Sequence, residues 1–177
     1  MRMILAAALV LAPQFAFAAG SDDTEPPKPT ATTTECAKGE VWDEKTSACI
    51  KTEDSSLNDD QRFGAVRELA YAGRADEAMV VLASMTEGDT PRVLTYQGFL
   101  LRQTGQIEDS IAAYERAIAM DKGNILARSY YGQLLVQMDE KDAAQLQLAA
   151  IRMHGGGGTW AEQALSNAIA TGVTYTY

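Results

Sequence analysis

Small and large side chains recur in the same order at three places in the chain. The middle set is Gly98, Leu101, Ser110 and Tyr114, the set 34 residues later is Gly132, Leu135, Ala144 and Leu148, and the set 32 residues earlier is Val66, Leu69, Ala78 and Leu82. A fixed period of this kind is typical of stacked helical repeats. With the apolar spacing between them, these positions predict helices over residues 58–72, 75–86, 91–104, 107–120, 125–138, 140–153 and 160–171.

Turn and cap residues separate the predicted helices. Thr90-Pro91 supplies an N-cap followed by proline at the first helical position, and Thr159 to Glu162 has the spacing of a capping box. The turns at Gly73, Gly105 and Asp139 are short, so each helix pair must fold back antiparallel. Residues 159–171 carry one apolar stripe, which predicts a helix that caps the end of the stack.

Residues 58–153 resemble tetratricopeptide repeat proteins. In the middle repeat the family's motif positions are occupied by Leu94, Gln97, Gly98 and Leu101 in the first helix and by Ser110 and Tyr114 in the second. The chain departs from the motif at Lys122, where proline is expected, and at Val66, where glycine is expected. The resemblance implies an all-α fold, a right-handed solenoid of three antiparallel helix pairs over residues 56–153 with a capping helix over 159–171. It also implies a scaffold or adaptor that binds proteins and is not an enzyme.

In this family the first helix of each pair lines a concave face, and its exposed residues contact a peptide. By register, the resemblance implies a peptide-binding groove formed by Arg67, Tyr71, Arg92, Phe99, Arg102, Gln103, Gln133 and Gln137. The same register adds Phe63, Thr95, Ser129 and Val136. Arginine and aromatic side chains in one groove favour an acidic segment or a C-terminal peptide as the ligand.

The first 18 residues have the features of a signal peptide. Arg2 is followed by the apolar run Met3–Ala12 and by Ala16-Phe17-Ala18, a small-x-small cleavage pattern. We therefore expect an exported protein in the periplasm or cell envelope of a bacterium, with no membrane insertion after the signal is removed. Residues 19–35 are rich in proline and threonine, which predicts a disordered linker.

The two cysteines, Cys36 and Cys49, are expected to form a disulfide in an oxidising compartment. Apolar residues on both sides of a polar turn predict a hairpin over residues 36–50. This short segment is similar to one hairpin of chitin-binding peritrophin-like modules. Trp42 would either stack on a sugar ring, which would make the protein glycan-associated, or cover the disulfide.

The formal net charge of −9 disfavours nucleic acid and anionic headgroups as partners. A single histidine, without a nucleophile motif or a metal-ligand set, supports neither catalysis nor a cofactor. We therefore expect a protein or peptide partner. A role as a non-catalytic subunit of an envelope enzyme complex and self-association stay open, as does whether the tail over 172–177 packs on the cap or frays.

Overall fold

The computed structural model describes residues 33–175. The predicted signal peptide (1–18) and most of the predicted linker (19–35) lie outside the described residues. A short 3-10 helix, Thr33–Glu35, comes first, so the expected disorder does not extend to residue 35. Strands β1 (Glu40–Asp43) and β2 (Ala48–Lys51) then form an antiparallel hairpin.

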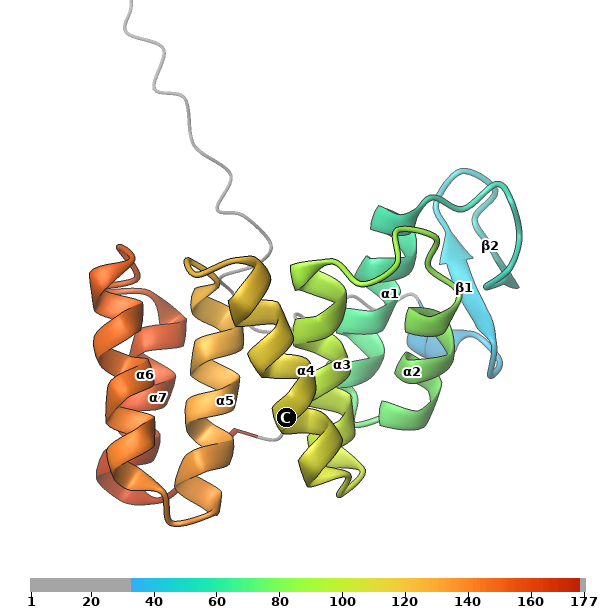
Figure 1. Ribbon diagram of the computed structural model, residues 1–177. Helices are drawn as coiled ribbons and strands as arrows, with labels where there is room; N and C mark the ends of the chain where they lie inside the picture. The colour runs from blue at the N-terminus through green and yellow to red at the C-terminus, as the bar shows by residue number, and fades with distance from the viewer. Residues whose placement is uncertain (1–32, 176–177) are drawn as a thin grey trace, which may run out of the picture.

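Seven helices follow within the described part of the chain (Figure 1), as the sequence predicts. They are α1 (Asp59–Tyr71), α2 (Ala75–Ala83), α3 (Pro91–Gln103), α4 (Ile107–Met120), α5 (Ile125–Gln137), α6 (Lys141–Met153) and α7 (Trp160–Thr171). The predicted bounds agree with these within about two residues, except that α2 ends at Ala83 instead of 86. The hydroxyl of Ser84 donates to the carbonyl oxygen of Val81 at 2.7 Å and caps the helix early.

Capping residues fix where several helices begin and end. Thr90 and Thr159 each accept a backbone N–H in the first turn of the helix that follows. Gly73 and Gly105 have φ of 71° and 80° in the turns that close the first two helix pairs. Asp139 takes the same left-handed conformation, with φ of 63°, in the third. Each pair is therefore closed by one residue at positive φ.

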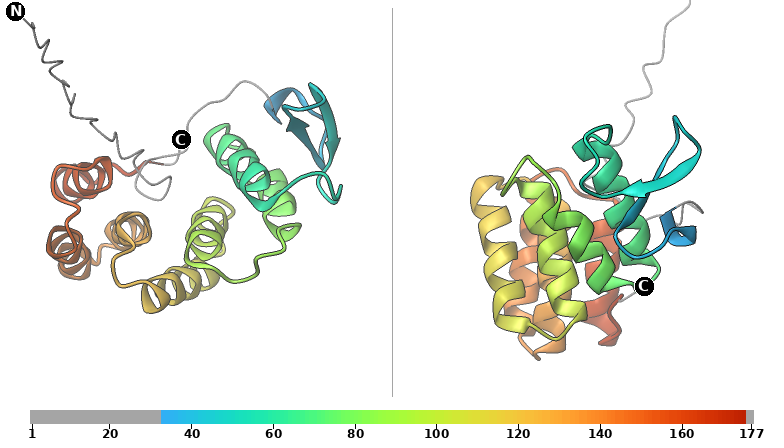
Figure 2. Two further views of the ribbon diagram at one scale, coloured as in Figure 1. Left: turned by 90° about the horizontal axis from the view of Figure 1, so that it is seen from above. Right: turned by 90° about the vertical axis from the view of Figure 1, so that its right-hand side faces the viewer.

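The helices form two layers bent into an arc (Figure 2, left). The first members of the pairs, α1, α3 and α5, lie along the inner side with α7, and α2, α4 and α6 lie outside them. Helix α7 packs against both α5 and α6, so it covers the end of the last pair. The predicted all-α fold of three helix pairs with a capping helix is confirmed.

A row of aromatic rings crosses the inner layer. Phe63 of α1 meets Tyr96 of α3 at 5.1 Å between ring centroids, and Phe99 of α3 meets Tyr130 of α5 at 4.8 Å. Tyr130 also contacts Trp160 of α7 at 6.2 Å. These rings belong to different repeats, so aromatic contacts join one repeat to the next.

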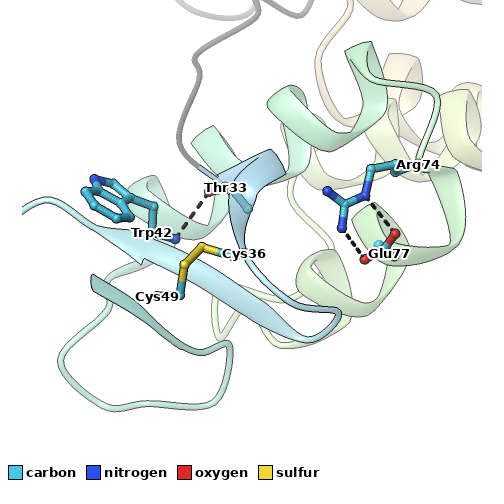
Figure 3. Close-up of a disulfide and its surroundings, with 6 residues drawn as sticks. All are labelled: Thr33, Cys36, Trp42, Cys49, Arg74 and Glu77. Atoms are coloured by element: carbon cyan, nitrogen blue, oxygen red, sulfur yellow. Dashed lines mark hydrogen bonds and ion pairs between the residues drawn. A yellow bond between two sulfur atoms is a disulfide. The ribbon is translucent and has the colours of Figure 1, made fainter. Parts of the chain in front are cut away.

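The hairpin packs on the first helix pair. Its disulfide joins Cys36 to Cys49, as predicted, and the Trp42 backbone N–H donates to the Thr33 hydroxyl (Figure 3). Val41 is buried in the core cluster of the helices. Trp42 pairs with Cys49 across the strands, so their side chains lie on the hairpin face opposite Val41. The hairpin thus covers the N-terminal end of the array.

Among the described helices, none is both long and apolar enough to cross a membrane.

Candidate functional site on the concave face

The inner side of the arc carries a pocket of about 300 Å³. It lies between the C-terminal ends of the inner helices and the turn after α1. Its lining residues are Gly73, Ala75, Phe99, Arg102, Gln103, Gln137 and Tyr175. Four of the predicted groove residues are therefore brought together at one place.

The chain's own C-terminal segment forms one wall of this pocket. Gly172, with φ of 76°, ends α7, and the next residues return to α5. The Gln137 Nε2 donates to the Thr174 hydroxyl at 2.7 Å, and the Tyr175 backbone N–H donates to Gln133 Oε1 at 2.9 Å. The Tyr175 ring also contacts Trp160, with 5.7 Å between ring centroids. The tail therefore packs on the inner face as far as Tyr175.

Arg102 connects the middle repeat, the last repeat and the tail. Its Nε donates to Gln137 Oε1 at 2.9 Å, and its two terminal nitrogens lie 3.5 Å from the carbonyl oxygens of Tyr130 and Tyr175. The side chain is buried. Its charge is held in the floor of the groove, where it faces backbone carbonyl groups.

The expectation that all groove residues are exposed contacts is wrong at several positions. Phe99 is 1% exposed and Gln133 is 0% exposed, and Arg102 is buried beside them. The same correction applies to the residues added by register, Phe63, Thr95, Ser129 and Val136. Neighbouring inner helices and α7 cover these positions; the Ser129 hydroxyl, for example, donates to the carbonyl oxygen of Ala161 in α7 at 2.7 Å.

Arg92 is also occupied within the chain. Its Nε and one terminal nitrogen donate to the two carboxylate oxygens of Glu87, both at 2.7 Å, and its other terminal nitrogen donates to Asp60 at 2.7 Å. Its guanidinium carbon lies 4.9 Å from the centroid of the Phe63 ring. The hydrogen bonds from Glu87 raise the pKa of Arg92 above its usual value. Arg92 joins α3 to α1 at the end of the groove away from the pocket.

The remaining predicted residues are accessible. Tyr71 and Gln137 are exposed, and Arg67 and Gln103 are partly exposed. Sequence reasoning did not assign Tyr175 to the site. The one available signal was the aromatic tail immediately after the helix-ending Gly172.

Between residues 33 and 175, no group of three or more histidine, cysteine, aspartate or glutamate side chains could hold a metal ion. Perturbed titration occurs instead on the outer layer. Burial, with a hydrogen bond to Glu115 at 3.1 Å, raises the pKa of Tyr131 to about 12. Tyr131 stacks on Tyr114 in a packed interface between α4 and α5, so we assign this group a structural role.

Residues 101–168 match the family model described as "Tetratricopeptide repeat". The match supports a tetratricopeptide repeat protein. It extends from the end of α3 into α7 and so includes the third helix pair and most of the capping helix. Tetratricopeptide repeats generally mediate protein–protein interactions, and the family is typically a non-catalytic scaffold. Comparison with curated proteins and with solved structures gave no match.

Proposed function

We propose that this chain is an exported scaffold or adaptor that binds an extended segment of a partner protein on its concave face. The observation that carries the proposal is that the face already holds an extended segment. Side chains of α5 hydrogen-bond to Thr174 and to the backbone of Tyr175. A surface that binds a piece of its own chain in this way has the donors and acceptors needed for a peptide.

The accessible part of the face supports a partner of mixed chemistry. Tyr71 offers an aromatic ring at the end of α1, and Gln103 offers an amide beside the pocket. Arg67 adds a positive charge on α1, in a protein whose overall charge is negative. A peptide that combines an aromatic residue with polar or acidic groups fits this surface.

Site-specific photo-crosslinking in cells tests the binding face. A photoreactive amino acid replaces Tyr71 or Gln103 on the concave face, and Leu146 or Met153, both exposed on α6, in the control variants. We expect a defined crosslinked partner from the concave positions and not from the α6 positions. The same partner captured only from α6 would move the binding surface to the outer layer.

The proposed location, the periplasm or cell envelope of a bacterium, is supported by the Cys36–Cys49 disulfide, because such bonds persist in oxidising compartments. Cell fractionation combined with thiol alkylation before reduction tests this location. We expect the protein in the periplasmic fraction with both cysteines protected from alkylation. Alkylated cysteines in a cytoplasmic pool would contradict the export proposal.

A further inference from the structure

The tail is held through its backbone at Tyr175. Gln133 Oε1 accepts the Tyr175 N–H at 2.9 Å, and Arg102 Nη2 lies 3.5 Å from the Tyr175 carbonyl oxygen. One side chain of α5 and one of α3 thus contact the two backbone polar groups of a single residue. This arrangement selects an extended backbone and does not depend on which side chain that residue carries.

Two further contacts read side chains. The Thr174 hydroxyl accepts from Gln137, which in turn accepts from Arg102, so the hydroxyl completes a chain of hydrogen bonds across the groove. The Tyr175 ring meets the indole of Trp160 and lines the pocket. A hydroxyl residue followed by an aromatic residue therefore matches this part of the groove.

The groove side of the contact is a built site. Gln133 is 0% exposed, and its Nε2 lies 3.4 Å from the hydroxyl of Ser129. Buried polar atoms are rarely left without a hydrogen bond, so the Gln133 oxygen requires a donor whenever the face is covered. In this structure the donor is the backbone N–H of Tyr175.

The tail itself is suited to leaving the groove. Val173 is 71% exposed and Tyr175 is 41% exposed, so much of the segment faces solvent. Gly172, at positive φ and with no side-chain neighbour at its Cβ position, separates the tail from the body of α7. Displacement of residues 173–175 therefore requires no change in the helices.

We propose that Val173–Tyr175 is an internal occupant of the peptide groove. The external ligand is an extended peptide segment in which a hydroxyl residue precedes an aromatic residue, and it binds by displacing the tail. This proposal rests on the proposed function, because it names the ligand class of the same groove. A tethered tail has a high effective concentration, so it lowers the apparent affinity of any competing peptide.

Fluorescence anisotropy with the full chain tests the proposal. The probe is a labelled synthetic peptide with the sequence of residues 171–177, TGVTYTY. Tyr175→Pro in the protein removes both the N–H that Gln133 accepts and the aromatic ring. Val173→Ala, at an exposed position of the same tail, is the matched control. We expect Tyr175→Pro to bind the probe about tenfold or more tightly than the wild-type and Val173→Ala proteins.

Two additions identify the contacts. Combining Tyr175→Pro with Gln133→Met, which removes the amide at similar size, or with Gln137→Ala at an exposed position should abolish the gain. A probe with alanine at both Thr174 and Tyr175 should bind at least about tenfold more weakly to the Tyr175→Pro protein. Equal binding of the two probes, or no gain from Tyr175→Pro, would overturn the proposal.

The outcome is separable from that of the proposed function. If the concave photo-crosslinks capture a partner but Tyr175→Pro gives no gain in probe binding, the groove binds a partner of other chemistry. The scaffold function would then stand and the tail proposal would fail. If Tyr175→Pro binds the probe but no concave crosslink forms in cells, the tail contact is real and the scaffold proposal fails.

Discussion

Gly98 of α3 lies directly against the ring of Tyr114 in α4. A Cβ added to Gly98 would lie 2.7 Å from Cε1 of Tyr114, well inside ordinary van der Waals contact. On the same turn the Ser110 hydroxyl donates to the carbonyl oxygen of Gly98 at 2.7 Å. The small residue, the hydroxyl and the large ring recur by position in the repeat, and here they close the middle helix pair.

Gly98→Ala should therefore destabilise the protein by about 1–3 kcal/mol, because the ring of Tyr114 is fully buried and has no space to move. Gly64→Ala in α1 is the matched control: Gly64 is exposed and nothing lies within 4 Å of its Cβ position. It should stabilise the protein by about 0.5–1 kcal/mol. Urea unfolding followed by circular dichroism measures both, and equal stabilities would contradict the packing described for this pair.

Arg62→Met should cost about 2–4 kcal/mol, because the guanidinium holds the segment between the hairpin and α1. Its nitrogens donate to the carbonyl oxygens of Thr52, Leu57 and Asp54 at 2.8, 2.8 and 3.0 Å, and the side chain is buried. Met preserves most of the volume and leaves three carbonyl groups without these donors. The measurement is the free energy of unfolding from urea titration.

The control for Arg62 is Arg152→Met. Arg152 pairs with Glu162 at 2.8 Å, but the arginine side chain is 55% exposed. Exposed ion pairs contribute little, so the change should cost less than about 1 kcal/mol. A loss at Arg152 as large as that at Arg62 would show that burial does not separate the two arginines.

Asp59 predicts a dependence of stability on pH. Burial would raise the pKa of its carboxyl, but hydrogen bonds from the Thr86 backbone and hydroxyl and from the Glu87 backbone, with the charge of Arg62, lower the pKa below its ordinary value of 3.8. A carboxyl whose pKa is lower in the folded state stabilises the fold above its ordinary pKa. That contribution is lost as the pH falls through the folded-state value.

Asp59→Asn should cost roughly 1–3 kcal/mol at pH 7. The difference from the wild-type protein should shrink steadily below about pH 4, as the wild-type carboxyl takes up a proton. Asp109→Asn, at an exposed position in the first turn of α4, should cost only about 0.3–1 kcal/mol. Thermal unfolding between pH 3 and pH 7 tests this, and a difference for Asp59→Asn that does not change with pH would contradict the role assigned to the charge.

The order of the helices was predictable because the repeat encodes it locally. Thr90, Pro91 and Thr159 mark helix starts by capping chemistry, and the spacing of Gly98 and Tyr114 encodes which helices pack together. These signals depend on neighbours within about one repeat. The early end of α2 was not predictable in the same way, because Ser84 caps the helix by turning its hydroxyl back to Val81.

The site was predictable only in part, because exposure depends on distant segments. Register placed Gln133 and Phe99 on the inner helices correctly, but neighbouring helices and the tail bury them. Arg92 was expected to face a ligand, yet it pairs with Glu87 and with Asp60, which is 32 residues away in sequence. Contacts over such separations have no signature in the local pattern.

The affinity of the partner captured by concave crosslinking tests the central claim most directly. The groove variant combines Tyr71→Ala with Gln103→Ala, and the matched outer variant combines Leu146→Ala with Met153→Ala, with folding of both checked by circular dichroism. Isothermal titration calorimetry should show Kd about tenfold or more weaker for the groove variant and unchanged for the outer variant. Unchanged binding by the groove variant, with a loss in the outer variant, would contradict recognition on the concave face.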